Sequence, residues 1–228
     1  MVMTSGCTTA KVKVAEPGQT FEEDVARVAA VRSALGPEGK LRIDVNAAWS
    51  VQMAAARIAR LAEFDLEYVE QPVASVEELV ELRPLIDVLV AADEAVRLAA
   101  DPMRVIESGA VDLLVLKVQP LGGMHRLLDL ARRSGLPVVV SSALETSVGL
   151  AAGVVAAAAL PALPYACGLG TATLLAGDVV DVPFVPEHGY VAVRRPEPTP
   201  ELLDRWHADR ETSSILMRRL RLAAELLT

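Results

Sequence analysis

The sequence contains few of the residues from which disulfide frameworks and zinc sites are built. Its 228 residues include two cysteines, Cys7 and Cys167, and three histidines. The two cysteines form no CxxC pair and are too few for a disulfide framework, which is typical of the reducing cytosol. Three scattered histidines argue strongly against a His-rich zinc site. We therefore expect a cytoplasmic protein without a disulfide framework.

Basic clusters and long apolar runs are also absent. The chain has 22 Lys and Arg against 30 Asp and Glu, a net charge of −8, and no basic block. This balance argues against a nucleic-acid partner and against binding to an anionic membrane surface. The apolar run 148–163 is shorter than the roughly 20 residues that a spanning helix needs. We interpret it as a helix buried against other protein, and we expect no membrane partner.

Aromatic residues make up only 4% of the chain, so Ala, Val and Leu must build the core. Short runs rich in Val and Leu alternate with helix-length segments, a pattern typical of a parallel sheet with crossover helices. Thr20, Ser50 and Ser75 are placed to cap three of these helices. The predicted strands are 10–14, 41–44, 66–70, 88–92, 112–117, 136–141 and a weak seventh at 165–167, and the predicted helices are 20–35, 50–62, 75–82, 101–108, 123–134 and 146–160.

This pattern leaves two architectures open. A closed (β/α)₈ barrel needs eight strands and usually about 250 residues, while an open doubly wound sheet needs fewer strands. Residues 178–195 are predicted to be extended, and 200–227 to form one or two helices. We expect residues 1–177 to form the α/β domain that carries the site. Residues 178–228 would be a C-terminal extended segment and closing helices of the same domain.

Charged residues end successive predicted strands in an ordered set. The order is lysine, three acids and lysine, with 23 to 31 residues between neighbours: Lys13, Asp44, Glu70, Asp93 and Lys117. Because the carboxyl ends of parallel strands lie on one side of the fold, these side chains can converge on one pocket.

Three converging carboxylates repel one another unless a divalent cation lies between them. Oxygen ligands without His or Cys indicate Mg²⁺, or alternatively Mn²⁺. A lysine whose pKa is lowered by burial and a nearby cation is suited to take a proton from carbon. Taken singly, these residues have other interpretations, because Asp93 could cap a helix and Lys11 and Lys13 could be surface lysines of an edge strand.

The ordered motifs KVK, DVN, EYVEQP, ADE and LKVQPLGG resemble the enolase superfamily, specifically its muconate-lactonizing-like branch. Over roughly residues 5–195, the segments GCTTAKVKVAEPGQ, DVNAAWS and SSALETSVGLAAG are most similar to the actinobacterial o-succinylbenzoate synthase family. The resemblance implies roles for ten residues: Lys13 as catalytic base and Lys117 as the opposite catalytic lysine; Asp44, Glu70 and Asp93 as Mg²⁺ ligands; Ser141 and Ser142 as substrate contacts; and Lys11, Asn46 and Gln71 as residues that tune or orient them.

The activity that this resemblance implies is a dehydration of 2-succinyl-6-hydroxy-2,4-cyclohexadiene-1-carboxylate to o-succinylbenzoate, in menaquinone biosynthesis. The partner would be this small carboxylate, and a homo-oligomer remains open. An N-acylamino acid racemase or a dipeptide epimerase is an alternative, because two lysines also suit racemisation. A non-catalytic, truncated metal-binding scaffold is the alternative from another class.

One feature departs from the family pattern. Its members carry an α+β capping domain and a first barrel strand before the KxK strand, whereas this chain starts almost at that strand. The resemblance therefore implies an incomplete TIM-type (β/α) barrel of about seven strands, with the first strand and the α+β capping domain missing. Because the cap normally closes the pocket, its absence would affect specificity.

Overall fold

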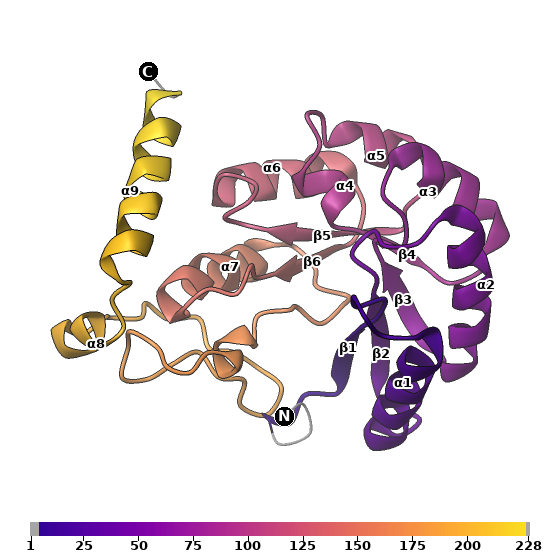
Figure 1. The fold of residues 1–228 in the computed structure, drawn as a ribbon, viewed down its shortest axis with the longest axis horizontal. Coiled ribbons are helices and arrows are strands. Elements are labelled where there is room, and N and C mark those ends of the chain that lie inside the picture. The colour runs from indigo at the N-terminus through magenta and orange to yellow at the C-terminus, as the bar shows by residue number, and fades with distance from the viewer. Residues whose placement is uncertain (1–4, 227–228) are drawn as a thin grey trace.

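A curled sheet of six parallel strands forms the centre of the computed structural model, which describes residues 5–226 (Figure 1). The strands are hydrogen-bonded in chain order, and every neighbouring pair is parallel. The first six predicted strands are all found within two residues of their predicted ends, and the strand predicted at 88–92 is three residues long. They are β1 Thr9–Lys13, β2 Lys40–Asp44, β3 Leu66–Glu70, β4 Val90–Ala92, β5 Leu113–Lys117 and β6 Val138–Ser141.

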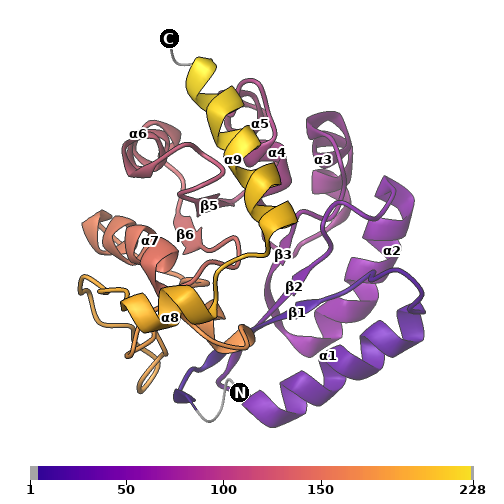
Figure 2. The ribbon, with the colours of Figure 1, turned by 60° about the vertical axis from the view of Figure 1, so that its left-hand side comes forward.

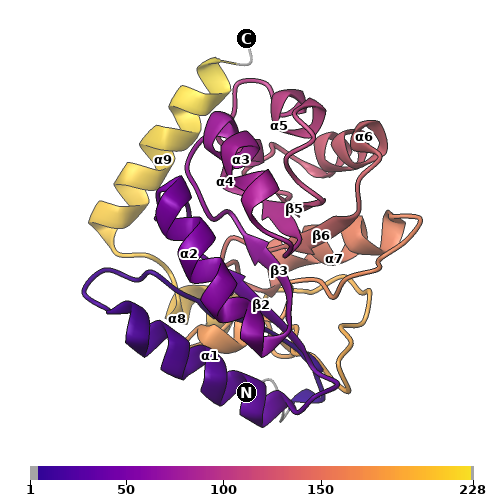
Figure 3. The same ribbon diagram turned by 90° about the vertical axis from the view of Figure 1, so that its right-hand side faces the viewer.

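The helices connect successive strands and form an arc outside the sheet (Figures 1 and 3). Thr20 and Ser75 close capping boxes with Glu23 and Glu78, as predicted, and Ser50 caps its helix. One short helix, α4, was not predicted. The helices up to residue 159 are α1 Phe21–Leu35, α2 Val51–Leu61, α3 Val76–Leu82, α4 Glu94–Arg97, α5 Met103–Glu107, α6 Met124–Ser134 and α7 Ser147–Ala159, with 3-10 turns at Ala62–Phe64 and Arg83–Leu85.

The two faces of the sheet bury different side chains because residues alternate along each strand. On the convex face, residues such as Leu41, Ile43 and Leu114 pack against the helices in the main hydrophobic core. On the concave face, a separate small cluster forms around Tyr68 and contains no helix residue. Helices therefore cover only the convex face, which excludes the doubly wound alternative and supports a partial barrel.

The predicted seventh strand at 165–167 is not confirmed. Gly168 forms a single parallel bridge to Ser141, with its N–H donating to the carbonyl of Val140 at 2.8 Å. Among the described residues, the sheet therefore has six strands and one bridge at its β6 edge. The absence of a first barrel strand and of a capping domain stays a prediction.

A long segment without regular strands extends from the β6 side of the sheet to the β1 side. At one end, Asp178 accepts hydrogen bonds from the backbone and hydroxyl of Ser147, at the start of α7. At the other end, the N–H of Gly189 donates to the carbonyl of Ser5 at 3.0 Å, just before β1. The segment links the two edges of the partial barrel (Figure 1), and the extended conformation predicted for 178–195 stays a prediction.

Two helices end the described chain, α8 Pro200–Arg205 and α9 Arg210–Glu225. The ring of Trp206 lies so close to Gly177 that a Cβ at this glycine would overlap it. In contrast, α9 has no buried residue and lies on the surface (Figure 2). That these helices close the same domain stays a prediction. Residues 1–4 and 227–228, which the predicted domain includes, lie outside the described residues. Between residues 5 and 226, no helix has the length and apolar character to cross a membrane.

Candidate active site

Three buried carboxylates lie at the carboxyl ends of β2, β3 and β4. Asp44 and Glu70 are the last residues of their strands and are aligned by the strand register, and Asp93 directly follows β4. Each is at most 1% exposed. Ionised carboxylates at this depth need partners, because the loss of hydration is costly.

Lys11 and Lys13 supply positive charge from the neighbouring strand β1. The ammonium of Lys11 donates to Asp44 at 2.8 Å and to Glu70 at 2.7 Å, while that of Lys13 donates to Asp44 at 2.7 Å. Burial opposes the charge of Lys11, but the carboxylates of Glu70 and Asp44 outweigh it and raise its pKa. The same lysines outweigh burial at Asp44 and lower its pKa.

On the opposite flank, Lys117 ends β5 and its ammonium donates to Asp93 at 2.5 Å. Strand pairing places Lys117 beside Ser141, the last residue of β6. The two predicted catalytic lysines therefore contact the acids from opposite sides, Lys13 through Asp44 and Lys117 through Asp93. The structure brings together all five residues of the predicted ordered set.

Glu70 is the middle one of the three acids, and its ionised form is disfavoured by its surroundings. Burial raises its pKa to about 7, since the charges of Asp44 and Asp93 add to this effect and Lys11 only partly opposes it. An excess of buried negative charge of this kind is what a divalent cation would neutralise. Three carboxylates without His or Cys match the oxygen ligands that Mg²⁺ and Mn²⁺ prefer, so the residues fit such an ion in kind.

The present side-chain arrangement holds lysine ammonium groups against these acids. Among residues 5–226, no three His, Cys, Asp or Glu side chains are grouped closely enough to cage a metal ion as they stand. Binding of a cation by Asp44, Glu70 and Asp93 would therefore require the carboxylates and lysines to reorient. The assignment of these three residues as ligands stays a prediction.

The residues predicted to orient the acids contact them as follows. Asn46 accepts a short hydrogen bond from Lys13, and its backbone N–H donates to Asp44 at 3.1 Å. Gln71 is fully buried, and its side-chain oxygen accepts from the backbone N–H groups of Asp93 and Ala95 at 3.1 and 3.0 Å. Asn46 and Gln71 have positive φ angles of 47° and 39°, a backbone conformation that costs free energy and is common at functional sites.

Ser141 and Ser142, the predicted substrate contacts, lie at the same end of the sheet and are partly exposed. The hydroxyl of Ser142 is hydrogen-bonded to that of Thr171 at 2.6 Å. The carboxylate of Glu145 accepts from the N–H of Ala143 and so fixes the loop that follows. Their role as substrate contacts stays a prediction.

Two residues of α4 belong to the site but were not predicted to act there. Arg97 donates to Asp93 at 3.1 Å and to Glu94 at 2.7 Å, and Glu94 also accepts from the amide of Asn46 at 3.2 Å. The sequence signal that could have revealed them is their spacing. Arg97 follows Asp93 by four residues and Glu94 by three, and side chains at these separations are neighbours on a helix. The predicted pattern contained no helix there.

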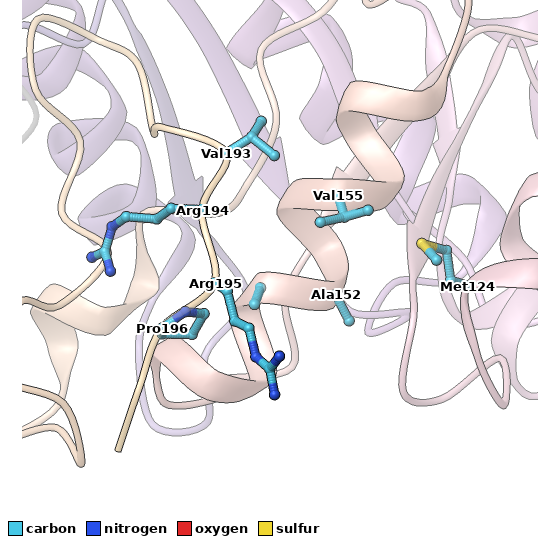
Figure 4. Close-up of a pocket in the computed structure, with 8 residues that line it drawn as sticks. Met124, Ala152, Val155, Val193, Arg194, Arg195 and Pro196 are labelled. Carbon is cyan, nitrogen blue, oxygen red and sulfur yellow. The ribbon is translucent and has the colours of Figure 1, made fainter. Parts of the chain in front are cut away.

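An apolar groove lies elsewhere on the molecule. It measures about 460 Å³ and lies between α7 and the segment 193–196, with Met124 of α6 at its edge (Figure 4). Ala152, Val155 and Val193 line it, and it contains neither a carboxylate nor a lysine. Proton transfer therefore has no basis in this groove, and the strand ends remain the candidate site.

Comparisons with known proteins agree with the fold. A family profile described as "Enolase C-terminal domain-like" matches residues 1–198. An o-succinylbenzoate synthase from Thermobifida fusca (strain YX) is 63% identical over 195 residues, which cover 86% of this chain and 62% of that protein. The chain thus spans about three fifths of the length of this relative.

Solved structures show the same architecture. The muconate lactonizing enzyme from Pseudomonas putida is 22% identical, with a TM-score of 0.80, and the alignment covers 90% of this chain and 60% of that one. A dipeptide epimerase from Enterococcus faecalis V583 is 29% identical, with a TM-score of 0.70, over 82% of this chain and 55% of that one. The first likeness supports the partial-barrel fold alone.

Proposed function

The chain belongs to the enolase C-terminal domain-like family, and we propose that its site dehydrates 2-succinyl-6-hydroxy-2,4-cyclohexadiene-1-carboxylate to o-succinylbenzoate. The observation that carries this proposal is the set of three buried carboxylates at consecutive strand ends, contacted by lysines from both sides. The 63% identical relative bears the name of this enzyme. The reaction would serve menaquinone biosynthesis, and the partner is the small carboxylate substrate.

Asp44, Glu70 and Asp93 are proposed to hold one Mg²⁺ ion, with Mn²⁺ as the alternative. When bound, the ion would neutralise these acids and polarise the carboxylate of the substrate. The raised pKa of Glu70 supports this assignment, because it reflects buried negative charge that lacks a full counter-charge. Reorientation of Asp44 would also free the ammonium group of Lys13 that now contacts it.

In the proposed mechanism, Lys13 accepts the proton from the carbon next to the substrate carboxylate. The same lysine then returns a proton to the departing hydroxyl group, so that one water molecule leaves and the ring becomes aromatic. Lys117 remains cationic on the opposite side and stabilises the negative charge that develops on the substrate. Ser141 and Ser142 are proposed to contact the substrate beside Lys117, in agreement with the pairing of Lys117 and Ser141.

Racemisation or epimerisation on the same scaffold is the less supported alternative. The dipeptide epimerase is 29% identical, against 63% for the synthase. Both reactions begin with removal of a proton next to a carboxylate, so the lysines alone do not distinguish them. Deuterium exchange at the α-carbon of an N-acylamino acid or a dipeptide, without an aromatic product, would favour this alternative.

The test is the appearance of o-succinylbenzoate by ultraviolet absorption, with Mg²⁺, with Mn²⁺ and with a chelator. Replacing Lys13 by Ala should lower the rate by about 10²- to 10⁴-fold, the usual contribution of a general base. Lys40→Ala is the matched control, since Lys40 is exposed at the start of β2, remote from the acids. Metal-independent product, equal rates of the two variants, or no product from the folded chain would each overturn the proposal.

A further inference from the structure

Arg97 connects the partner of Lys117 with the hydrogen-bond network that reaches Lys13. Its Nε donates to one oxygen of Asp93, whose other oxygen accepts from Lys117. Its Nη2 donates to Glu94, which accepts from Asn46, and Asn46 in turn accepts from Lys13. A continuous chain of hydrogen bonds thus runs from Lys13 to Lys117 through a single guanidinium.

The geometry of α4 explains why an arginine occupies this position. The helix has only four residues, and its side chains point back toward its N-terminus, where Asp93 and Glu94 lie. A guanidinium presents several donors in a fixed planar fork, so it can hold two carboxylates at a set separation. A lysine at the same place would supply one rotatable ammonium.

The burial of the acids makes this contact consequential. Asp93 is fully buried, and Glu94 has one oxygen that is buried without a hydrogen-bond partner among the described residues. Arg97 itself is 27% exposed. Without the guanidinium, Asp93 would keep only Lys117, and Glu94 only Asn46, as side-chain donors among the described residues.

We propose that Arg97 is a positioning residue that fixes the distance between Lys13 and Lys117, through Glu94 and Asn46 on one side and Asp93 on the other. The inference rests on the proposed function only in that it takes these lysines as the catalytic pair. Arg97 does not contact the proposed reacting atoms, so its effect should fall on turnover rather than on substrate binding.

Arg97→Ala should therefore lower kcat by about 10- to 100-fold, the usual cost of removing a supporting contact, with KM nearly unchanged. Added guanidinium ion should restore part of the lost rate, and Arg97→Lys should retain an intermediate rate. Arg83→Ala is the control, because Arg83 is 29% exposed and is bonded to Asp112, which precedes β5 at the opposite end of the sheet.

A second readout does not depend on turnover. The chain has only four lysines, and all but Lys40 lie in the site. In NMR spectra of protein labelled with ¹³C at lysine Cε, Arg97→Ala should move the Lys13 and Lys117 signals and leave Lys40 in place. Arg83→Ala should move neither, and the spectra also show whether each variant is folded.

The outcomes separate the two proposals. If the unchanged chain makes no o-succinylbenzoate but Arg97→Ala still shifts the Lys13 and Lys117 signals, the positioning role is supported and the proposed function is overturned. Unmoved signals in folded Arg97→Ala, a rate loss equal to that of Arg83→Ala, or a change confined to KM would overturn the positioning role. If Arg97→Ala does not fold, Arg97→Gln is judged by the same spectra.

Discussion

The convex and concave faces of the sheet are built from alternate residues of the same strands, yet only the concave face buries charged side chains, beside a small apolar cluster. On the convex face, Leu41 and Ile43 are completely buried against helices. On the concave face, the intervening Arg42 and Asp44 are almost as deeply buried, at 4% and 1% exposure, and both are charged. At these positions the depth of burial is thus nearly the same on both faces, while the chemistry of the side chains differs.

This difference separates a face that mainly stabilises the fold, the convex one, from a face that carries the proposed site, the concave one. Burial of the convex side chains is favourable by itself, at roughly 25 cal/mol per Å² of apolar surface. The concave charges are tolerated only through specific partners, because removing one partner leaves an uncompensated charge. Substitutions on the two faces should therefore change the free energy of unfolding by different amounts and in different directions. These changes should also depend differently on pH and on divalent cations.

The largest expected effect comes from breaking the concave ion pair of Arg42 and Glu67, whose side chains are 5% and 15% exposed. Glu67→Ala should lower the free energy of unfolding by about 3–5 kcal/mol, since it leaves Arg42 buried without its carboxylate. Urea denaturation measures this loss. Glu63→Ala is the control, because it removes a pair with Arg60 on the exposed surface, worth about 1 kcal/mol at most. Similar losses in the two variants would contradict the comparison.

A cavity on the convex face should cost slightly less. Ile43→Ala should destabilise the protein by about 2–5 kcal/mol, from lost burial and an unfilled space beneath the helices. The stabilisation that Mg²⁺ adds should match that of the unchanged protein, because the site lies on the other face. Thermal unfolding with and without Mg²⁺ tests both points, and a weakened response to Mg²⁺ would show that the faces are coupled.

A concave substitution should have the opposite sign. The folded-state pKa of Glu70 is raised from 4.5 to about 7, so its ionisation destabilises the metal-free protein as pH rises through this window. Glu70→Gln removes that charge and should stabilise the metal-free chain by about 1–3 kcal/mol above pH 7. The gain should vanish near pH 4.5, where both side chains are neutral. Urea denaturation at a series of pH values tests this prediction. Destabilisation by Glu70→Gln, or a gain that does not change with pH, would contradict it.

The smallest effect is expected away from both faces. Thr20→Ala removes the capping hydrogen bond to Glu23 at the start of α1, where the helix is exposed. The loss should be about 1 kcal/mol, typical of an N-cap, with no change in the response to Mg²⁺ or in the rate. Equilibrium unfolding and the product assay together check this prediction.

Much of the fold could be predicted because local and periodic signals agree along the strands and helices. Capping residues such as Thr20 and Ser75 mark helix starts through hydrogen bonds between residues only three positions apart. The ordered charges at strand ends predicted the site because parallel strands place their carboxyl ends together. These signals do not depend on how distant parts of the chain meet.

The remaining features depend on contacts that no local pattern encodes. Arg42 donates to the carbonyl of Ala166, 124 residues away, so its burial could not be predicted from its strand. The missing seventh strand has a similar cause, because residues 165–167 contact the concave face through Tyr165 and Arg42 rather than extending the ladder beyond Gly168. Arg97 was overlooked since α4 is too short to show a periodicity.

The strict chain order of the strands has a consequence for how the site is made during synthesis. Each strand pairs with the one made just before it, so the sheet can grow by one βα unit at a time. Lys11 and Lys13 are made first and meet Asp44 and then Glu70 as later units are added. The buried acids of β2 and β3 thus arrive beside lysines that have already been made. Neither acid depends on Lys117, which is made later, for its nearest positive charge.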